Sequence, residues 1–179
     1  MKINFFLLII LLIFTGFTMK DKQQNHHSSK GEQLVNSILG KTAKIIKDKY
    51  NLKPCGSGTA MPGGPIQEVT LCFDTKLPYT KNQLRELLIK SAEELLNQVN
   101  EDKEIHQFLK DQPFTIRNVE IIIYNNDKNG LEVFDPAISV ARISQGNLIY
   151  RTTDVNDTFK YKKEFQESYE EALKTLSTP

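Results

Sequence analysis

The chain has 179 residues, of which 39% are hydrophobic and 25% are charged. These values are close to those of ordinary globular proteins, and they exclude collagen, a largely disordered chain and a protein with many membrane spans. Two cysteines are too few for a small domain held together by a dense set of disulfides. The length predicts one domain, long enough to bury its own hydrophobic core.

The charge of the chain is nearly balanced, with 23 lysines and arginines against 22 acidic residues. A general nucleic-acid-binding surface needs an excess of positive charge, because it must neutralise phosphates. We therefore expect no nucleic acid among the partners.

The N-terminus is typical of an export signal: Lys2 precedes an apolar run from Phe5 to Phe14, which continues more weakly to Met19. About 15 helical residues reach only about 22 Å, less than the ~30 Å core of a bilayer. Small residues that would mark a cleavage site are poorly placed, so a cleaved signal peptide and a retained membrane anchor both stay open for residues 1–19. We expect an exported protein that is periplasmic, secreted or anchored by this segment.

Residues 20–31 are polar and are predicted to be a tether. They include His26 and His27, which lack further metal ligands nearby and are interpreted as part of a solvated linker. A single domain is then expected over residues 32–179.

The first half of this domain is predicted to contain two long helices. Apolar residues at helical spacing predict a helix over Glu32–Lys49. A Gly- and Pro-rich loop precedes a strand over Ile66–Asp74, which alternates apolar and polar residues. Thr80 and Gln83 form a capping box, which predicts the start of the second long helix. A short helix over Asp102–Lys110 is expected to follow.

The second half is predicted to be mainly strands. These are expected over Thr115–Tyr124, Leu131–Phe134, Ile138–Ile143 and Leu148–Thr153, with turns at Asn129-Gly130 and at residues 144–147. A last helix is expected over Tyr161–Leu176.

Successive strands joined by short turns predict an α+β fold with an antiparallel sheet of four to five strands and helices packed on one face. This domain stands behind the N-terminal signal or anchor helix. The other face of the sheet is left free, and Arg117, Glu120, Arg142 and Arg151 are expected to lie on it. Such a face either binds a partner or is simply solvated.

The loop at residues 55–64 is the most unusual feature of the sequence. Glycines allow backbone amides to approach a ligand, so Gly56, Ser57, Gly58 and Thr59 are candidate ligand-binding residues for a small molecule or an anion. The loop lacks the Lys-Ser/Thr pair of a P-loop and is not followed by a helix. A purely structural connection is the alternative.

Cys55 and Cys72 are the only cysteines. In an exported chain an even number favours a disulfide, and these two would face each other if residues 51–57 paired with 66–73. Two buried free thiols are the alternative. A catalytic Cys55 would need a base, and nothing in the sequence places His106 near it.

Other catalytic and metal-binding motifs are missing from the sequence. Asn125–Gly130 matches the first half of a calcium loop, but the twelfth position falls on Pro136, so a hairpin turn is favoured. No paired-carboxylate site, nucleophile elbow or zinc spacing occurs. We therefore expect no cofactor and no metal.

Several short segments are familiar in their order along the chain: Tyr50-Asn51-Leu52-Lys53, Gly56-Ser57-Gly58 with Met61, Leu71-Cys72-Phe73, Leu84-Arg85-Glu86-Leu87, Pro113-Phe114-Thr115 with Asn118, and Tyr169-Glu170-Glu171-Ala172-Leu173. Over roughly residues 45–175 the chain resembles a set of uncharacterised exported proteins of chlamydia-like bacteria. The resemblance implies export by a host-associated Gram-negative bacterium and a role in the periplasm or envelope. It implies no activity, substrate or catalytic residue.

Two function classes follow. The first is a non-enzymatic envelope or interaction domain that binds an unknown protein partner, with the N-terminal segment as its contact with the membrane. The second is a small-molecule or anion-binding domain, or an enzyme, that uses the loop 55–64.

Overall fold

The computed structural model describes residues 29–177 of the chain. The predicted signal or anchor segment at residues 1–19 and most of the predicted tether lie outside the described residues. Within 29–177, no helix is long and apolar enough to cross a membrane. The domain begins with Ser29, which caps the first helix.

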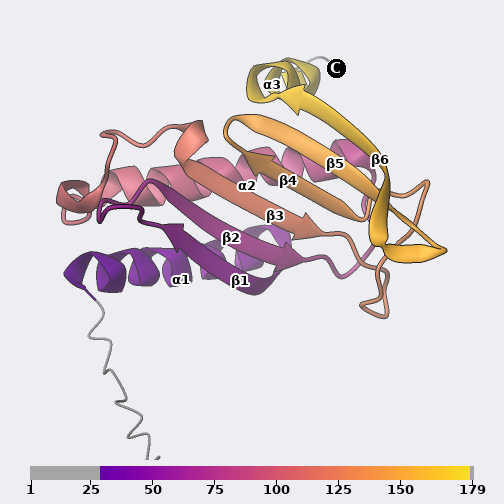
Figure 1. Cartoon of the computed structure of the whole chain (residues 1–179), viewed down its shortest axis with the longest axis horizontal. Coiled ribbons are helices and arrows are strands. Elements are labelled where there is room, and N and C mark those ends of the chain that lie inside the picture. The colour runs from indigo at the N-terminus through magenta and orange to yellow at the C-terminus, as the bar shows by residue number, and fades with distance from the viewer. Residues whose placement is uncertain (1–28, 178–179) are drawn as a thin grey trace, which may run out of the picture.

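Three α-helices and six strands make up the domain (Figure 1). In chain order they are α1 (Lys30–Tyr50), β1 (Lys53–Ala60), β2 (Glu68–Asp74), α2 (Lys81–Glu101), β3 (Val119–Tyr124), β4 (Val140–Ser144), β5 (Asn147–Asp154), β6 (Asp157–Ser168) and α3 (Tyr169–Ser177). Two short 3₁₀ helices, η2 (His106–Phe108) and η3 (Ile116–Asn118), lie between α2 and β3.

All six strands form one sheet in the order of the chain, β1 to β6. Neighbouring strands are antiparallel except β2 and β3, which are parallel. A parallel pair needs a crossover connection, and α2 provides it. The predicted antiparallel sheet of four to five strands is therefore wrong in the number of strands and in one pairing, whereas the mixture of helices and strands is confirmed.

Local signals explain where the two long helices begin. The Thr80 hydroxyl accepts a hydrogen bond from the Gln83 amide, and the Gln83 side chain accepts one from the Thr80 amide, which confirms the predicted capping box. Ser29 and Glu32 form the same arrangement at the start of α1. Each box satisfies backbone amides that have no partner inside the helix.

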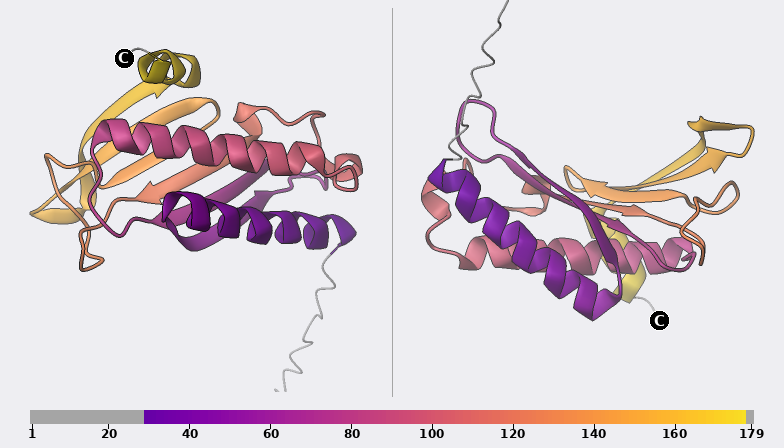
Figure 2. Two further views of the ribbon diagram at one scale, coloured as in Figure 1. Left: turned by 180° about the vertical axis from the view of Figure 1, so that it is seen from behind. Right: turned by 90° about the horizontal axis from the view of Figure 1, so that it is seen from below.

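α1 and α2 lie side by side on one face of the sheet, as both views in Figure 2 show. The core lies between these helices and the inward residues of the strands. On β3, the alternation predicted from the sequence is confirmed, because Val119, Ile121 and Ile123 are all fully buried. The opposite face of the sheet carries no helix (Figure 2).

The predicted C-terminal helix is the largest error of the sequence analysis. Its first half belongs to β6, and only the residues from Tyr169 onward are helical. The strand pairs along its whole length with β5, so that Phe165 lies opposite Tyr150 and Glu164 opposite Arg151. Without β6, β5 would leave an unpaired edge, and that long-range hydrogen bonding outweighs local helix propensity.

Smaller differences concern loops. The Gly-rich segment is not entirely a loop, because residues 53–60 form the edge strand β1. The helix expected over Asp102–Lys110 is reduced to the single turn η2. The strand expected over Leu131–Phe134 contributes one isolated bridge, between Asn126 and Glu132.

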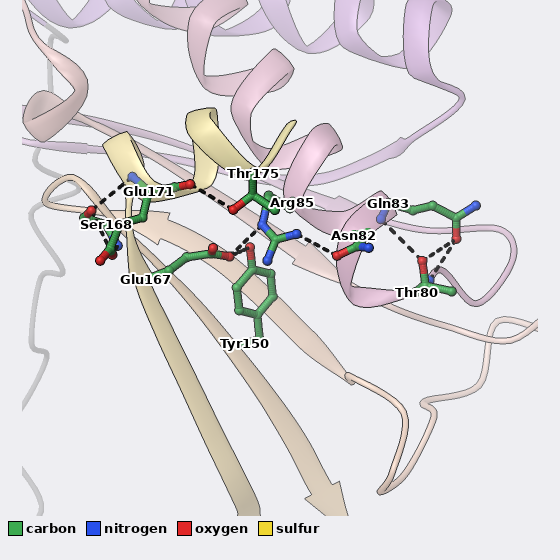
Figure 3. Close-up of polar contacts among 9 residues, drawn as sticks. All are labelled: Thr80, Asn82, Gln83, Arg85, Tyr150, Glu167, Ser168, Glu171 and Thr175. Carbon is green, nitrogen blue, oxygen red and sulfur yellow. Dashed lines mark hydrogen bonds and ion pairs between the residues drawn. The ribbon is translucent and has the colours of Figure 1, made fainter. Parts of the chain in front are cut away.

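A buried polar network joins α2 to the last two strands (Figure 3). The Arg85 guanidinium donates from Nε to Glu167 at 2.8 Å and from Nη1 to Asn82 at 2.6 Å. The Tyr150 hydroxyl donates to the same Glu167 oxygen at 2.6 Å. Burial and the Glu167 carboxylate together raise the pKa of Tyr150. Because every charged member has a partner, this network is part of the scaffold that holds β6 against the domain.

Candidate functional site: the open face of the sheet

The face of the sheet without helices, here called the open face, is built by the alternate residues of each strand. The register places a continuous row of residues across it, from Gly56 on β1 through Cys72, Ile122, Arg142 and Ile149 to Gln166 on β6. On β2 to β5 the residues of this row are partly exposed, whereas their sequence neighbours on the covered face are buried. The open face is thus the largest surface that the fold leaves without a packing partner of its own.

Charges on the open face are paired with one another. Arg151 donates to Glu164 at 2.6 Å, and Arg142 lies 3.9 Å from Glu120. Glu120 also accepts a hydrogen bond from the Thr70 hydroxyl at 3.1 Å. The structure therefore places Glu120, Arg142 and Arg151 on the free face, as expected, but most of their charge is compensated there.

Arg117, the fourth residue expected on this face, lies instead in η3 at the end of the sheet. It lines a polar cavity of about 610 Å³, together with Ala60, Gln67, Glu68, Lys110, Asp111, Thr115, Asn118 and Gln145. The acids of this polar cavity are held by amides, since Gln145 donates to Glu68 at 2.6 Å and Asn118 donates to Asp111 at 2.9 Å. Among residues 29–177, no acidic side chain forms an ion pair with the Arg117 guanidinium.

Exposed aromatic side chains gather at the other end of the open face. Tyr124, Phe159 and Tyr161 have exposed fractions of 40%, 98% and 53%. They line a cavity of about 570 Å³, here called the aromatic cleft, together with Asp74, Asn126, Gly130, Glu132, Ser139, Val140 and Thr158. The β5–β6 turn and the first residues of β6 extend beyond the part of the sheet that the helices cover (Figures 1 and 2). Because Phe159 and Tyr161 belong to this part of β6, their rings do not pack into the core.

The two cysteines lie near each other on β1 and β2 and are free thiols in the structure. The pairing of β1 with β2 that a disulfide would require is present, but a β-bulge places Gly56 rather than Cys55 opposite Cys72. Burial, with smaller contributions from Asp74 and Cys72, raises the pKa of Cys55 to about 11. Burial and Glu120 also raise the pKa of Cys72. The disulfide stays a prediction, and protonated thiols are poor nucleophiles at neutral pH.

The candidate ligand-binding residues Gly56, Ser57, Gly58 and Thr59 form part of the edge strand β1 rather than a loop around a ligand. Each pairs in register with β2, from Gly56 opposite Cys72 to Thr59 opposite Val69. A strand presents its amides singly along an edge, so these residues do not form the anion cradle that the sequence suggested. The adjacent polar cavity begins where β1 ends, at Ala60.

The remaining candidates have structural partners. His106 Nε2 lies 2.9 Å from the Asn100 carbonyl oxygen. Asp127 accepts hydrogen bonds from the Asn129 and Leu131 amides, and these bonds lower its pKa, as in a hairpin turn. Within residues 29–177 no three metal-ligating side chains come together.

The sequence analysis missed Phe159 and Tyr161 as surface residues because it placed Tyr161 at the start of a helix and Phe159 in no element. The polar turn Asp154-Val155-Asn156-Asp157 is the signal that could have revealed a hairpin here. In the structure, Asp154 pairs with Asp157 across that turn. Glu132 was missed as well, since its place at the cleft depends on the fold of the whole loop between β3 and β4.

Comparisons with known proteins add no relative: no protein-family model, no curated protein and no solved structure matches this chain. The functional argument therefore depends on the geometry of the open face alone.

Proposed function

We propose that this protein is a non-enzymatic, exported interaction domain that binds a protein partner on the open face, at the aromatic cleft. The observation that carries the proposal is the exposure of Phe159, 98% of whose surface is accessible, beside the half-exposed Tyr161 and Tyr124. Aromatic residues are enriched at protein interfaces, where they bury a large area at a low cost in conformational entropy. Together they line one concave site, which distinguishes them from apolar residues scattered singly over a surface.

Two further observations support binding rather than catalysis. The charged residues across the open face are paired with one another, which suits a surface that is to be covered. The two thiols, the most reactive side chains on this face, have raised pKa values because of burial. A thiol nucleophile would need the opposite shift.

Site-specific photo-cross-linking in the native host tests this proposal. A benzophenone amino acid replaces Phe159 in the full chain, and the matched control places it at the exposed Lys44 on α1. We expect one discrete protein adduct from position 159, none of the same mass from position 44, and loss of the adduct when Tyr161→Ala is added. The same adduct from both positions, or none from position 159, would contradict the proposal.

The export part of the proposal depends on residues 1–19 and on the resemblance to exported bacterial proteins. The intact mass of the chain isolated from its host, with and without reductant, tests it. Loss of about 18 residues supports a cleaved signal, and the full-length mass in a membrane fraction supports an anchor. A full-length mass in the cytosol would contradict export. In the same spectra, a deficit of about 2 Da that reductant removes identifies a disulfide.

A second candidate function is binding of a small anion, and Arg117 favours it. Arg117 lines a cavity of about 610 Å³ in which both acids, Glu68 and Asp111, are already held by amides. In this candidate the anion binds in the polar cavity at the end of β1, and not at the β1 glycines that the sequence suggested. Inorganic phosphate should then raise the melting temperature of the full chain but not that of Arg117→Gln. Equal shifts in both proteins would exclude it.

A further inference from the structure

The charges that line the aromatic cleft have one sign. Its only ionisable side chains besides the tyrosines are Asp74 and Glu132, and none of the described lining residues is a lysine or arginine. The cleft therefore combines three aromatic rings with two carboxylates. Aromatic faces and carboxylates both attract cations, the rings through their quadrupole and the carboxylates through their charge.

The two carboxylates differ in how far the protein neutralises them. Glu132 accepts a hydrogen bond from the Thr153 hydroxyl at 2.6 Å, which leaves its charge uncompensated. Asp74 accepts from the Asn126 amide at 3.3 Å, and its nearest cation, Lys53, is 4.0 Å away and 68% exposed. Among the described residues, Glu132 therefore differs from Asp74, Glu120 and Glu164, each of which has a lysine or arginine within 4.0 Å.

One ring of the cleft already binds a cation within the protein. The Arg151 guanidinium carbon lies 4.7 Å from the centre of the Tyr161 ring, the geometry of a cation–π contact. Tyr161 remains 53% exposed despite this contact, and Phe159 carries no such contact among the described residues. The surface that remains accessible is therefore aromatic and faces an excess of negative charge.

We infer that the aromatic cleft binds a cationic side chain, a guanidinium or an alkylammonium, presented by the partner protein. This inference rests on the proposed function, because it specifies the chemistry of the partner at that same site. The cavity of about 570 Å³ is large enough to hold such a side chain and its neighbours. The alkyl stem packs on Phe159 and Tyr161, while the charged end reaches Glu132 and Asp74.

The absence of tryptophan from the chain allows a direct test. Phe159→Trp introduces a single fluorescent reporter at a position that is 98% exposed, so the fold should tolerate it. The full chain, kept in a neutral detergent, is titrated with Nα-acetyl-arginine amide and with Nα-acetyl-citrulline amide, its uncharged isostere. Leu176→Trp, on α3 beyond the other end of β6, is the matched control for non-specific quenching.

We expect a saturable change for the arginine compound, with a Kd in roughly the millimolar range, and binding of the citrulline compound weaker by about tenfold. Adding Glu132→Gln to Phe159→Trp should weaken arginine binding by a similar factor, and adding Tyr161→Ala by about threefold or more. Equal binding of the two compounds, unchanged binding in Glu132→Gln, or the same change in Leu176→Trp would overturn the inference.

The two proposals fail separately. A cross-linked partner at position 159 without preference for arginine over citrulline leaves the interaction domain intact and removes only the cationic ligand. Selective arginine binding without any cross-linked partner in the host removes the interaction domain and leaves a cation-selective cleft.

Discussion

The two faces of the same sheet differ sharply although they share every strand. On β3, Ile121 points to the helices and is fully buried, whereas its neighbour Ile122 lies on the open face between Cys72 and Arg142. The covered face is apolar on β2, β3 and β4, whereas the open face carries ion pairs, thiols and exposed rings. The period of two along a strand thus lets one segment of sequence serve stability on one side and recognition on the other.

The same contrast applies to two arginines. Arg85 is on the helix side, with only 8% of its side chain exposed, and its partner Glu167 is 14% exposed. Arg151 is on the open face, with 26% exposed, and its partner Glu164 is 48% exposed. Their hydrogen bonds are of similar length, at 2.8 and 2.6 Å. Burial, rather than distance, should therefore decide how much each pair contributes.

The largest effect is expected when the buried pair is broken. Arg85→Met should lower the free energy of unfolding by about 3–5 kcal/mol, because Glu167 is left as a poorly solvated charge. Arg151→Met should cost about 0–1 kcal/mol, as for other exposed pairs. Urea denaturation of both variants measures the difference. Similar losses would show that the two faces are equally solvated, contrary to the structure.

The next largest effect on the free energy of unfolding is expected from two adjacent isoleucines of β3, Ile121 and Ile122. Ile121→Ala should cost about 2–5 kcal/mol, since it removes a fully buried side chain and leaves a cavity. Ile122→Ala should cost about 1 kcal/mol, because its side chain is already partly in water. The denaturation midpoints report both values. If Ile122→Ala cost as much as its neighbour, the open face would have to be covered in solution, for example by a second chain.

Thiol chemistry gives a third comparison, between folded and unfolded protein. Since burial raises the pKa of Cys55 to about 11, the thiolate is scarce at neutral pH. Alkylation of Cys55 by iodoacetamide at pH 8 should be slower by about ten- to a hundredfold in the folded chain than in urea. The rate should rise with pH until the pH passes about 11. Peptide mass analysis measures the rate, and equal rates in both states would contradict the raised pKa of Cys55.

The smallest effect concerns the glycines of β1. A Cβ at Gly58 would lie 3.7 Å from the Thr70 Cβ, an ordinary contact, so Gly58→Val should stabilise the edge strand by about 0.5–1 kcal/mol. Gly146→Val is the matched control. Its φ of +78° is strained for any side chain, and it should lose about 1–2 kcal/mol. Thermal melts distinguish the two, and a destabilised Gly58→Val would revive a special role for the β1 glycines.

Local patterns in the sequence predicted the elements whose causes are local. The start of α2 follows from Thr80 and Gln83, which lie three residues apart. The turn between β4 and β5 follows from Gln145 and Gly146, both at positive φ. The inward face of β3 follows from simple alternation. In each case the residues that decide the conformation are neighbours in the chain.

The aromatic cleft, in contrast, could not be assembled from local patterns. Tyr161 was assigned to a helix, Glu132 to a short strand and Phe159 to no predicted element. Their common location depends on the pairing of β6 with β5 and on the path of the loop after β3. The cleft brings Asp74 of β2 together with residues of β3, β4 and β6, and period and propensity do not report contacts between separate strands.

By itself, then, the sequence determined a mixed α and β domain, the two long helices, the cap of α2 and the inward faces of the central strands, because capping and periodicity are short-range effects. Only the tertiary structure decided that β2 and β3 are parallel, that residues 157–168 form a strand, and that three aromatic rings meet two carboxylates at one end of the open face. Backbone hydrogen bonds between distant segments outweigh local preference there, and they bring together the residues on which the proposed function depends.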